Sequence, residues 1–109
     1  MSAPRQLAPR QAAVDEVVAS WPDVKAKQVF GHRGYVRGGT MFAFLADEGV
    51  SVRTFSAEQS AELYARDGVV PFVYRPGMEM AAWPVLPLRS DAELDDALTA
   101  VRRAYEGAI

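Results

Sequence analysis

The stretch KQVFGHRGYVRGGTMFAFLADEGVSVRTF, residues 27–55, decides the fold. It alternates short runs rich in β-branched and aromatic residues with glycine-containing turns, which is typical of strands joined by tight connections. The pair Gly38-Gly39 predicts a two-residue hairpin turn, because such a turn needs positive φ and glycine adopts it without steric cost. We therefore expect this stretch to supply most of one sheet.

Six segments have strand character, and proline and glycine set their limits. Residues 40–46 show no alternation, which predicts a central strand covered on both faces. Gly31 and Gly34 are expected in the turn between the first two strands, where positive φ is needed. Pro71 predicts an edge strand or a strand that begins at Phe72, and two later prolines make residues 78–88 an edge or bulged strand. The predicted strands are 28–30, 35–37, 40–46, 50–55, 69–74 and 78–88.

Three helices are expected around these strands. In residues 11–21 the apolar positions recur every three or four residues, which predicts a helical stripe that Pro22 ends. The stripe consists of Val14, Val17, Val18 and Trp21. Capping boxes at 56–59 and 90–93 predict a short helix to about Asp67 and a C-terminal helix to Gly107.

The predicted fold class is α+β: an antiparallel sheet of about five to six strands with an N-terminal helix, a short middle helix and a C-terminal helix. Residues 1–9 contain two prolines and no apolar period, and we expect them to form a flexible tail. Residues 10–109 are expected to form a single domain.

Composition limits the possible functions. Half of the 109 residues are hydrophobic and 24% are charged, as in an ordinary globular domain. The absence of cysteine excludes disulfides, thiolate catalysis and cysteine-based metal sites. No apolar run approaches the ~20 residues of a membrane span, and the N-terminus lacks the apolar core of a signal peptide, so a cytoplasmic location is expected. A net charge of −2 and a pI near 5.3 mean that nucleic-acid binding would require a local basic patch.

The sequence resembles the TfoX N-terminal domain family, with a broad likeness in layout to YjbR/MmcQ proteins. The resemblance covers roughly residues 12–106, and its most specific part is the run from Phe30 to Leu45. Later members of the pattern fall in the expected order, and a C-terminal helix follows them. The matching positions are Val29-Phe30-Gly31, Gly34-Tyr35-Val36, Gly38, Met41-Phe42-Ala43-Phe44-Leu45, Pro71-Phe72, Tyr74, Met80 and Trp83.

The resemblance implies a compact α+β domain with an antiparallel sheet and no cofactor. It also implies a regulatory role, since TfoX proteins are associated with the regulation of bacterial competence genes and YjbR-like proteins are often described as DNA-binding. Many relatives have a glycine-rich turn where this sequence has Gly31-His32-Arg33-Gly34, which places two potentially cationic residues there.

The candidate contact residues are cationic or aromatic and lie on or beside the predicted strands. One interpretation is a patch that binds phosphates or a partner. The other is a solvated sheet face on which charge prevents unwanted strand pairing. His32, the only histidine, has no local partner for catalysis or metal binding and is expected in an exposed turn. The set is His32, Arg33, Tyr35, Arg37, Arg53 and Arg75, with Lys25 and Lys27 beside it.

Three aromatic residues, Phe72, Tyr74 and Trp83, form either core or a ligand groove, with Tyr64 as a candidate neighbour, and both alternatives stay open.

No catalytic, cofactor-binding or metal-binding residue is assigned. The first hypothesis is a non-enzymatic regulatory or interaction module that contacts a protein partner, or a second copy as a homodimer, across an exposed strand edge. The alternative is direct nucleic-acid binding through the Lys and Arg side chains. The third is a small-ligand binder or an unrecognised enzyme.

Overall fold

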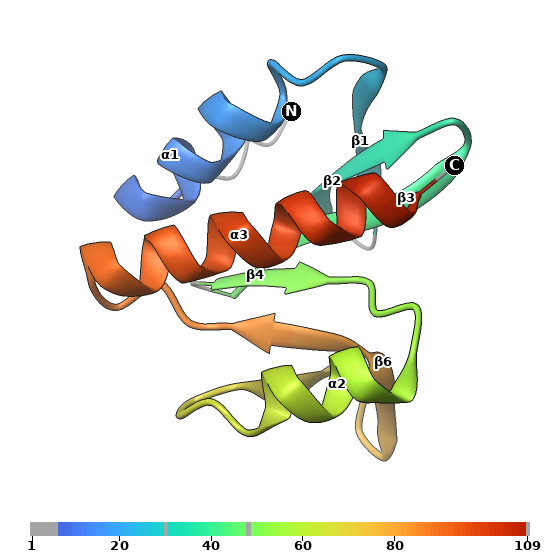
Figure 1. The fold of residues 1–109 in the computed structure, drawn as a ribbon, viewed down its shortest axis with the longest axis vertical. Helices are drawn as coiled ribbons and strands as arrows, with labels where there is room; N and C mark the ends of the chain where they lie inside the picture. Colours follow the sequence, from blue (N-terminus) through green and yellow to red (C-terminus); the bar gives the residue numbers. More distant parts are fainter. Residues whose placement is uncertain (1–6, 30, 48, 109) are drawn as a thin grey trace.

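The computed structural model describes residues 7–29, 31–47 and 49–108. Two predictions therefore fall outside the described residues: the strand end at Phe30 and residues 1–6 of the tail. Within the described part, three helices and six strands form one α+β unit, which confirms the predicted fold class (Figure 1). Their order is α1 (Pro9–Val18), β1 (Val24–Val29), β2 (His32–Arg37), β3 (Thr40–Ala46), β4 (Gly49–Val52), α2 (Ala57–Tyr64), β5 (Val70–Arg75), β6 (Met78–Leu86) and α3 (Asp91–Gly107).

All described strand pairs are antiparallel, and the order across the sheet is β1-β2-β3-β4-β6-β5. The edges of the described sheet are thus β1 and β5, and the prediction that Pro71 lies on an edge strand is confirmed. The prediction of an edge position for residues 78–88 is wrong, because β6 lies between β4 and β5. The alternative of a bulged strand is confirmed by its irregular register.

Strand β6 tolerates proline inside the sheet because its pairing is interrupted. Only Val85 and Leu86 pair with β4, and the register with β5 jumps between the Pro71–Pro84 pair and the Phe72–Met80 pair. Pro84 therefore lies opposite another proline, and Pro87 follows the end of the strand. Neither proline removes an N–H from a continuous ladder.

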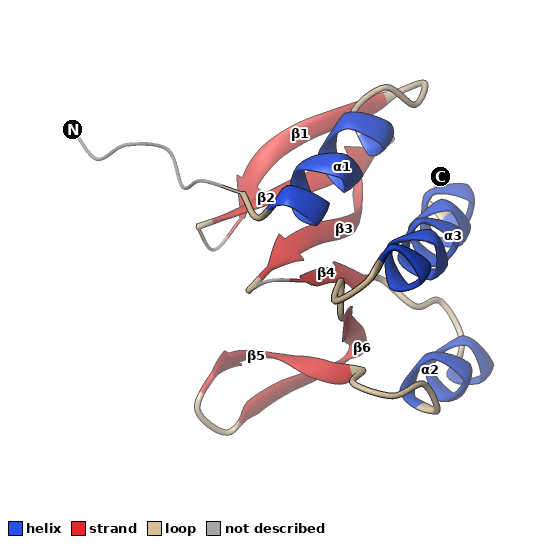
Figure 2. Ribbon diagram, turned by 90° about the vertical axis from the view of Figure 1, so that its left-hand side faces the viewer, coloured by secondary structure: helices blue, strands red, loops and turns tan. Residues whose placement is uncertain are grey.

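The three helices lie on one face of the sheet (Figure 2). Their buried side chains join those of β2, β3 and β4 in the main core. On α1, Val14 and Val18 are buried as predicted, whereas Val17 is partly exposed. The prediction that Trp21 continues the helical stripe is wrong, since α1 ends at Val18; Trp21 instead packs against the core from the following loop.

Strand β3 contributes to both faces of the sheet, and a bulge interrupts its alternation. Tyr35 pairs with Ala43, but the next residue, Val36, pairs with Met41, so Phe42 is an extra residue on β3. Phe42 and Ala43 both join the main core, and Phe44 joins a second cluster. The missing alternation in residues 40–46 thus predicted correctly a strand that is covered on both sides.

The second core is an aromatic cluster in which Phe44, Ala46, Phe72 and Trp83 are buried. The ring of Phe44 lies 4.8 Å from that of Phe72 and 5.2 Å from that of Trp83. His32 on β2 lies 5.8 Å from Phe72 on β5, although these strands are not neighbours in the sheet. The sheet therefore curls, and Phe72 and Trp83 are core residues, whereas Tyr74 is exposed.

Local signals for turns and caps were mostly correct. Gly38 and Gly39 both have positive φ, as the hairpin turn requires. Both predicted capping serines accept a hydrogen bond from the third helical amide, but α2 ends at Tyr64 and not at Asp67. The placement of Gly34 in a turn is wrong. Gly34 lies within β2, where an added Cβ would be 3.2 Å from Met41 and 3.3 Å from Val29.

Candidate interaction surface

Arg33 belongs to a partly buried polar contact between β2 and α1. Its Nε donates to Asp15 Oδ1 on α1, and the hydroxyl of Tyr35 donates to the same oxygen at 2.7 Å. Alternation along β2 places these two side chains on the helical face. Burial, and next the hydrogen bond to Asp15, raise the pKa of Tyr35 above its usual value. Asp15 thus holds two β2 side chains against α1.

The stability of the domain is expected to fall above pH ~10 in part because of Tyr35. Because the pKa of Tyr35 is raised in the folded state, the folded protein keeps the phenolic proton at a pH at which the unfolded chain releases it. The free energy of unfolding therefore falls as the pH rises above the pKa of the unfolded state. Tyr35→Phe removes the proton and should give a shallower alkaline decline in urea unfolding between pH 8 and 11. An unchanged slope would contradict this role of Tyr35.

Arg37 ties the end of β2 to the last turn of α3. Its Nη1 donates to the carbonyl of Tyr105 at 2.7 Å, and its guanidinium lies 4.2 Å from the centre of the Tyr105 ring. The same carbonyl accepts the N–H of Ala108 at 3.2 Å, and a cation beside the last carbonyls of a helix interacts favourably with the helix dipole. Arg37 therefore holds the helix on the sheet.

The other predicted contact residues lie apart from this pair. Arg53 follows β4, with its guanidinium 5.8 Å from the centre of the Trp83 ring. Arg75 lies next to the β5–β6 turn, 5.8 Å from the centre of the Tyr74 ring. The prediction that His32 lies in an exposed turn is wrong, since it is a partly buried residue of β2. The structure thus does not bring the predicted residues together into one basic patch.

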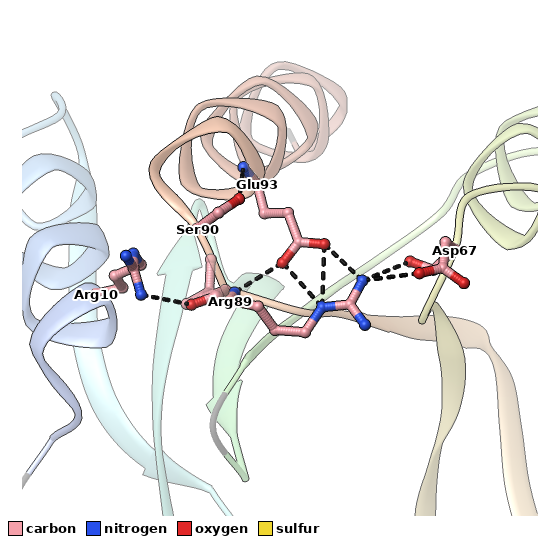
Figure 3. A network of polar contacts seen from close by, with 6 residues as sticks. Arg10, Asp67, Arg89, Ser90 and Glu93 are labelled. Atoms are coloured by element: carbon pink, nitrogen blue, oxygen red, sulfur yellow. Dashed lines mark hydrogen bonds and ion pairs between the residues drawn. The ribbon is translucent and has the colours of Figure 1, made fainter.

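A polar network that the sequence pattern did not single out surrounds the N-terminus of α3 (Figure 3). Arg89 binds Glu93 through Nε at 3.0 Å and Nη2 at 2.6 Å, and it reaches Asp67 Oδ2 at 3.1 Å. Arg89 lowers the pKa of Glu93 through these contacts. Arg10 on α1 pairs with Asp91 at 3.3 Å. One part of this network could have been found in the sequence, because Arg89 lies four residues before Glu93, the last residue of a capping box.

A groove of about 900 Å³ lies beside this network. Its lining includes Pro9, Ala13, Val70, Val85 and Leu94, with Arg10, Arg89 and Asp91 among the charged members. Since Arg10 and Arg89 already pair with Asp91, Glu93 and Asp67, the two cations are matched by three acids. The groove is therefore not a cationic site for an anion.

Among the described residues, no three His, Cys, Asp or Glu side chains are grouped so that they could hold a metal ion. In the same part of the chain, no helix is both long and apolar enough to cross a membrane.

The β5–β6 hairpin carries most of the large hydrophobic side chains that are exposed in the described part of the chain. Six large hydrophobic side chains are exposed in the described part of the chain, and four belong to this hairpin; we call these four the hairpin patch. They are Val70 (55% exposed), Val73 (51%), Tyr74 (47%) and Met78 (48%). In Figure 2 the hairpin extends away from the helices. An exposed strand edge was predicted as a contact, but none of the four residues was; Tyr74 was expected in the core or in a ligand groove.

The two edges of the described sheet differ in character. Lys25 and Lys27 are exposed on β1, and lysines on an edge strand discourage pairing with another strand. On β5 the first charged residue is Arg75, at the end of the strand. The apolar edge is thus β5.

A family model agrees with the fold. The model of the TfoX N-terminal domain matches residues 16–108, from within α1 to the residue after α3. A search among curated proteins finds no match to the chain.

Proposed function

The chain belongs to the TfoX N-terminal domain family, and from this membership we propose that it acts as a non-enzymatic regulatory or interaction module that contacts another protein segment through the hairpin patch. The observation that carries the proposal is the exposure of Val70, Val73 and Tyr74 on the edge strand β5 and of Met78 at the start of the adjoining β6. Contiguous exposed apolar residues mark interaction sites more often than single ones do.

An extended protein segment suits this edge. A strand added to β5 would find main-chain groups for hydrogen bonds, and its side chains would cover the patch. Pro71 has no N–H to donate, and Tyr74 is an extra residue in the register with β6. Both features shorten the regular ladder, so side-chain contacts must supply part of the affinity.

Direct nucleic-acid binding receives less support from the arginines. Arg33 is bound to Asp15 and Arg37 to Tyr105, so each already has a role within the domain. The absence of cysteine is consistent with the cytoplasmic location that we propose. We assign no catalytic residue.

The proposal is tested by capture with matched variants. Immobilised wild-type domain, Val73→Lys and Val17→Lys are exposed to nuclease-treated native extract, and the retained proteins are quantified by mass spectrometry. Val17 is an exposed valine on α1, so it controls for added charge away from the hairpin. Proteins held by the wild type and Val17→Lys should be reduced at least ~10-fold by Val73→Lys, a change of ~1.4 kcal/mol. Retention that does not depend on Val73 would contradict the proposal.

Duplex DNA should bind weakly, and the surface cations should matter little. Lys25→Gln, Lys27→Gln and Arg53→Gln combined change exposed side chains and leave the Asp15 and Tyr105 contacts intact. We expect fluorescence anisotropy to show no tight, salt-sensitive binding in the wild type or the triple variant. Tight wild-type binding that weakens steeply with salt and is lost in the triple variant would favour the nucleic-acid hypothesis.

A further inference from the structure

We infer that the protein segment that covers the hairpin patch is β5 of a second copy of this chain, in an antiparallel, two-fold symmetric contact; this inference rests on the proposed function and names its partner. A two-fold contact uses the same surface on both copies, so the surface must be complementary to itself. The distribution of charge on the two sheet edges decides which edge meets this condition.

Strand β1 is not complementary to itself. Antiparallel pairing of β1 with itself about Ala26 would place Lys25 opposite Lys27 of the second copy, twice in each dimer. Side chains directly opposite in such a pair lie about 4.5–5.5 Å apart, and like charges there are destabilising. The β1 edge is thus protected against association with itself.

Strand β5 is complementary to itself when two copies pair in the antiparallel direction. With the two-fold axis at Val73, that valine lies opposite its own equivalent, and Arg75 lies opposite Pro71 of the second copy. The two Arg75 residues are then four positions apart, roughly 14 Å at ~3.4 Å per residue. This separation exceeds the Debye length of ~8 Å at physiological ionic strength. Parallel pairing would place the two arginines side by side, so charge selects the antiparallel contact.

The same register places the prolines, which cannot donate a hydrogen bond, away from the centre of the shared ladder. Each Pro71, which lacks an N–H, lies towards an end of the shared ladder, and the apolar Val73 pair lies at its centre. The patch has only four half-exposed side chains, and a standard stable interface buries ~800 Å² per partner. The dimer should therefore be weak and should dissociate on dilution.

Disulfide trapping tests the contact directly, because the chain has no cysteine of its own. Val73→Cys, Val17→Cys and Lys25→Cys each place one thiol on an exposed position of β5, α1 and β1. Under mild oxidation, Val73→Cys should form a covalent dimer at least ~10-fold faster than either control, because only that thiol meets its equivalent at the axis. A Val73→Cys rate equal to that of Val17→Cys, or a faster rate for Lys25→Cys, would overturn the inference.

Sedimentation velocity of the unmodified chain gives a second readout. The wild type and Val17→Lys should shift from monomer to dimer with rising concentration, and Val73→Lys should remain monomeric. A wild type that stays monomeric at high concentration would overturn the second copy as partner. In that case the proposed function still stands if Val73→Lys loses a captured protein of different sequence, so the two failures are distinguishable.

Discussion

Replacing Gly49 by alanine is expected to lower the free energy of unfolding by about 3 kcal/mol. A Cβ at this position would lie 2.3 Å from the carbonyl oxygen of Leu86. That neighbour is main chain, so a side-chain rotation cannot relieve the overlap. Gly49 begins β4, and the short pairing of β4 with β6 joins β1, β2 and β3 to the β5–β6 hairpin. The substitution should therefore weaken the junction within the sheet, as measured by urea unfolding.

Gly39→Ala is the matched control. Gly39 has nothing within 4 Å of an added Cβ but has a φ of +82°, so its replacement should cost only the conformational penalty of about 1–2 kcal/mol. A loss at Gly49 no larger than that at Gly39 would show that β4 and β6 approach less closely than described.

Phe44→Ala is expected to cost about 3–5 kcal/mol, a large part of the 5–15 kcal/mol typical of a domain. The Phe44 side chain is 1% exposed, although it lies in the cluster on the face of the sheet that no described helix covers. Its ring meets those of His32, Phe72 and Trp83. Truncation would leave a cavity that these rings cannot fill without breaking the curl of the sheet.

Phe55→Ala provides the comparison for Phe44. Phe55 is 42% exposed, and replacement of a partly exposed aromatic should cost less than about 1 kcal/mol. Equal losses for the two variants, measured by urea unfolding under the same conditions, would contradict the description of the aromatic cluster as a second core.

Local signals predicted the elements of this fold because each depends on a few neighbouring residues. Gly38-Gly39 specified a hairpin turn, and Ser56 and Ser90 specified helix starts. The failure at residues 78–88 concerns a position that distant contacts determine. Whether residues 78–88 lie at an edge or inside the sheet depends on where β4 pairs, and the proline pattern does not contain that information.

The candidate contact residues illustrate the same limit. Arg33 and Arg37 alternate along β2 in a pattern that fits either an exposed patch or a strand bound to helices. The acceptors that decide between these are Asp15, 18 positions away, and Tyr105, 68 positions away. The placement of His32 between Phe44 and Phe72 likewise requires the curl of the sheet. For these residues the deciding contact lies far away in the sequence, so residue type alone could not place them.

The apolar edge of β5 could be predicted only in part. Pro71 indicated an edge strand, because proline cannot donate to a ladder on both sides. The exposure of Val70 and Val73, however, follows from the position of β5 outside β6 and from the extension of the hairpin beyond the helices. Apolar residues in a predicted strand are ordinarily assigned to core.

Hydrogen–deuterium exchange, compared between dilute and concentrated protein, tests most directly whether this domain makes contacts through β5. Both sheet edges are measured in one experiment, so β1 (Val24–Val29) is an internal control for β5 (Val70–Arg75). Exchange should slow with concentration at the amides of β5 and stay unchanged at those of β1. Protection at β1 or along α1, with β5 unchanged, would contradict it.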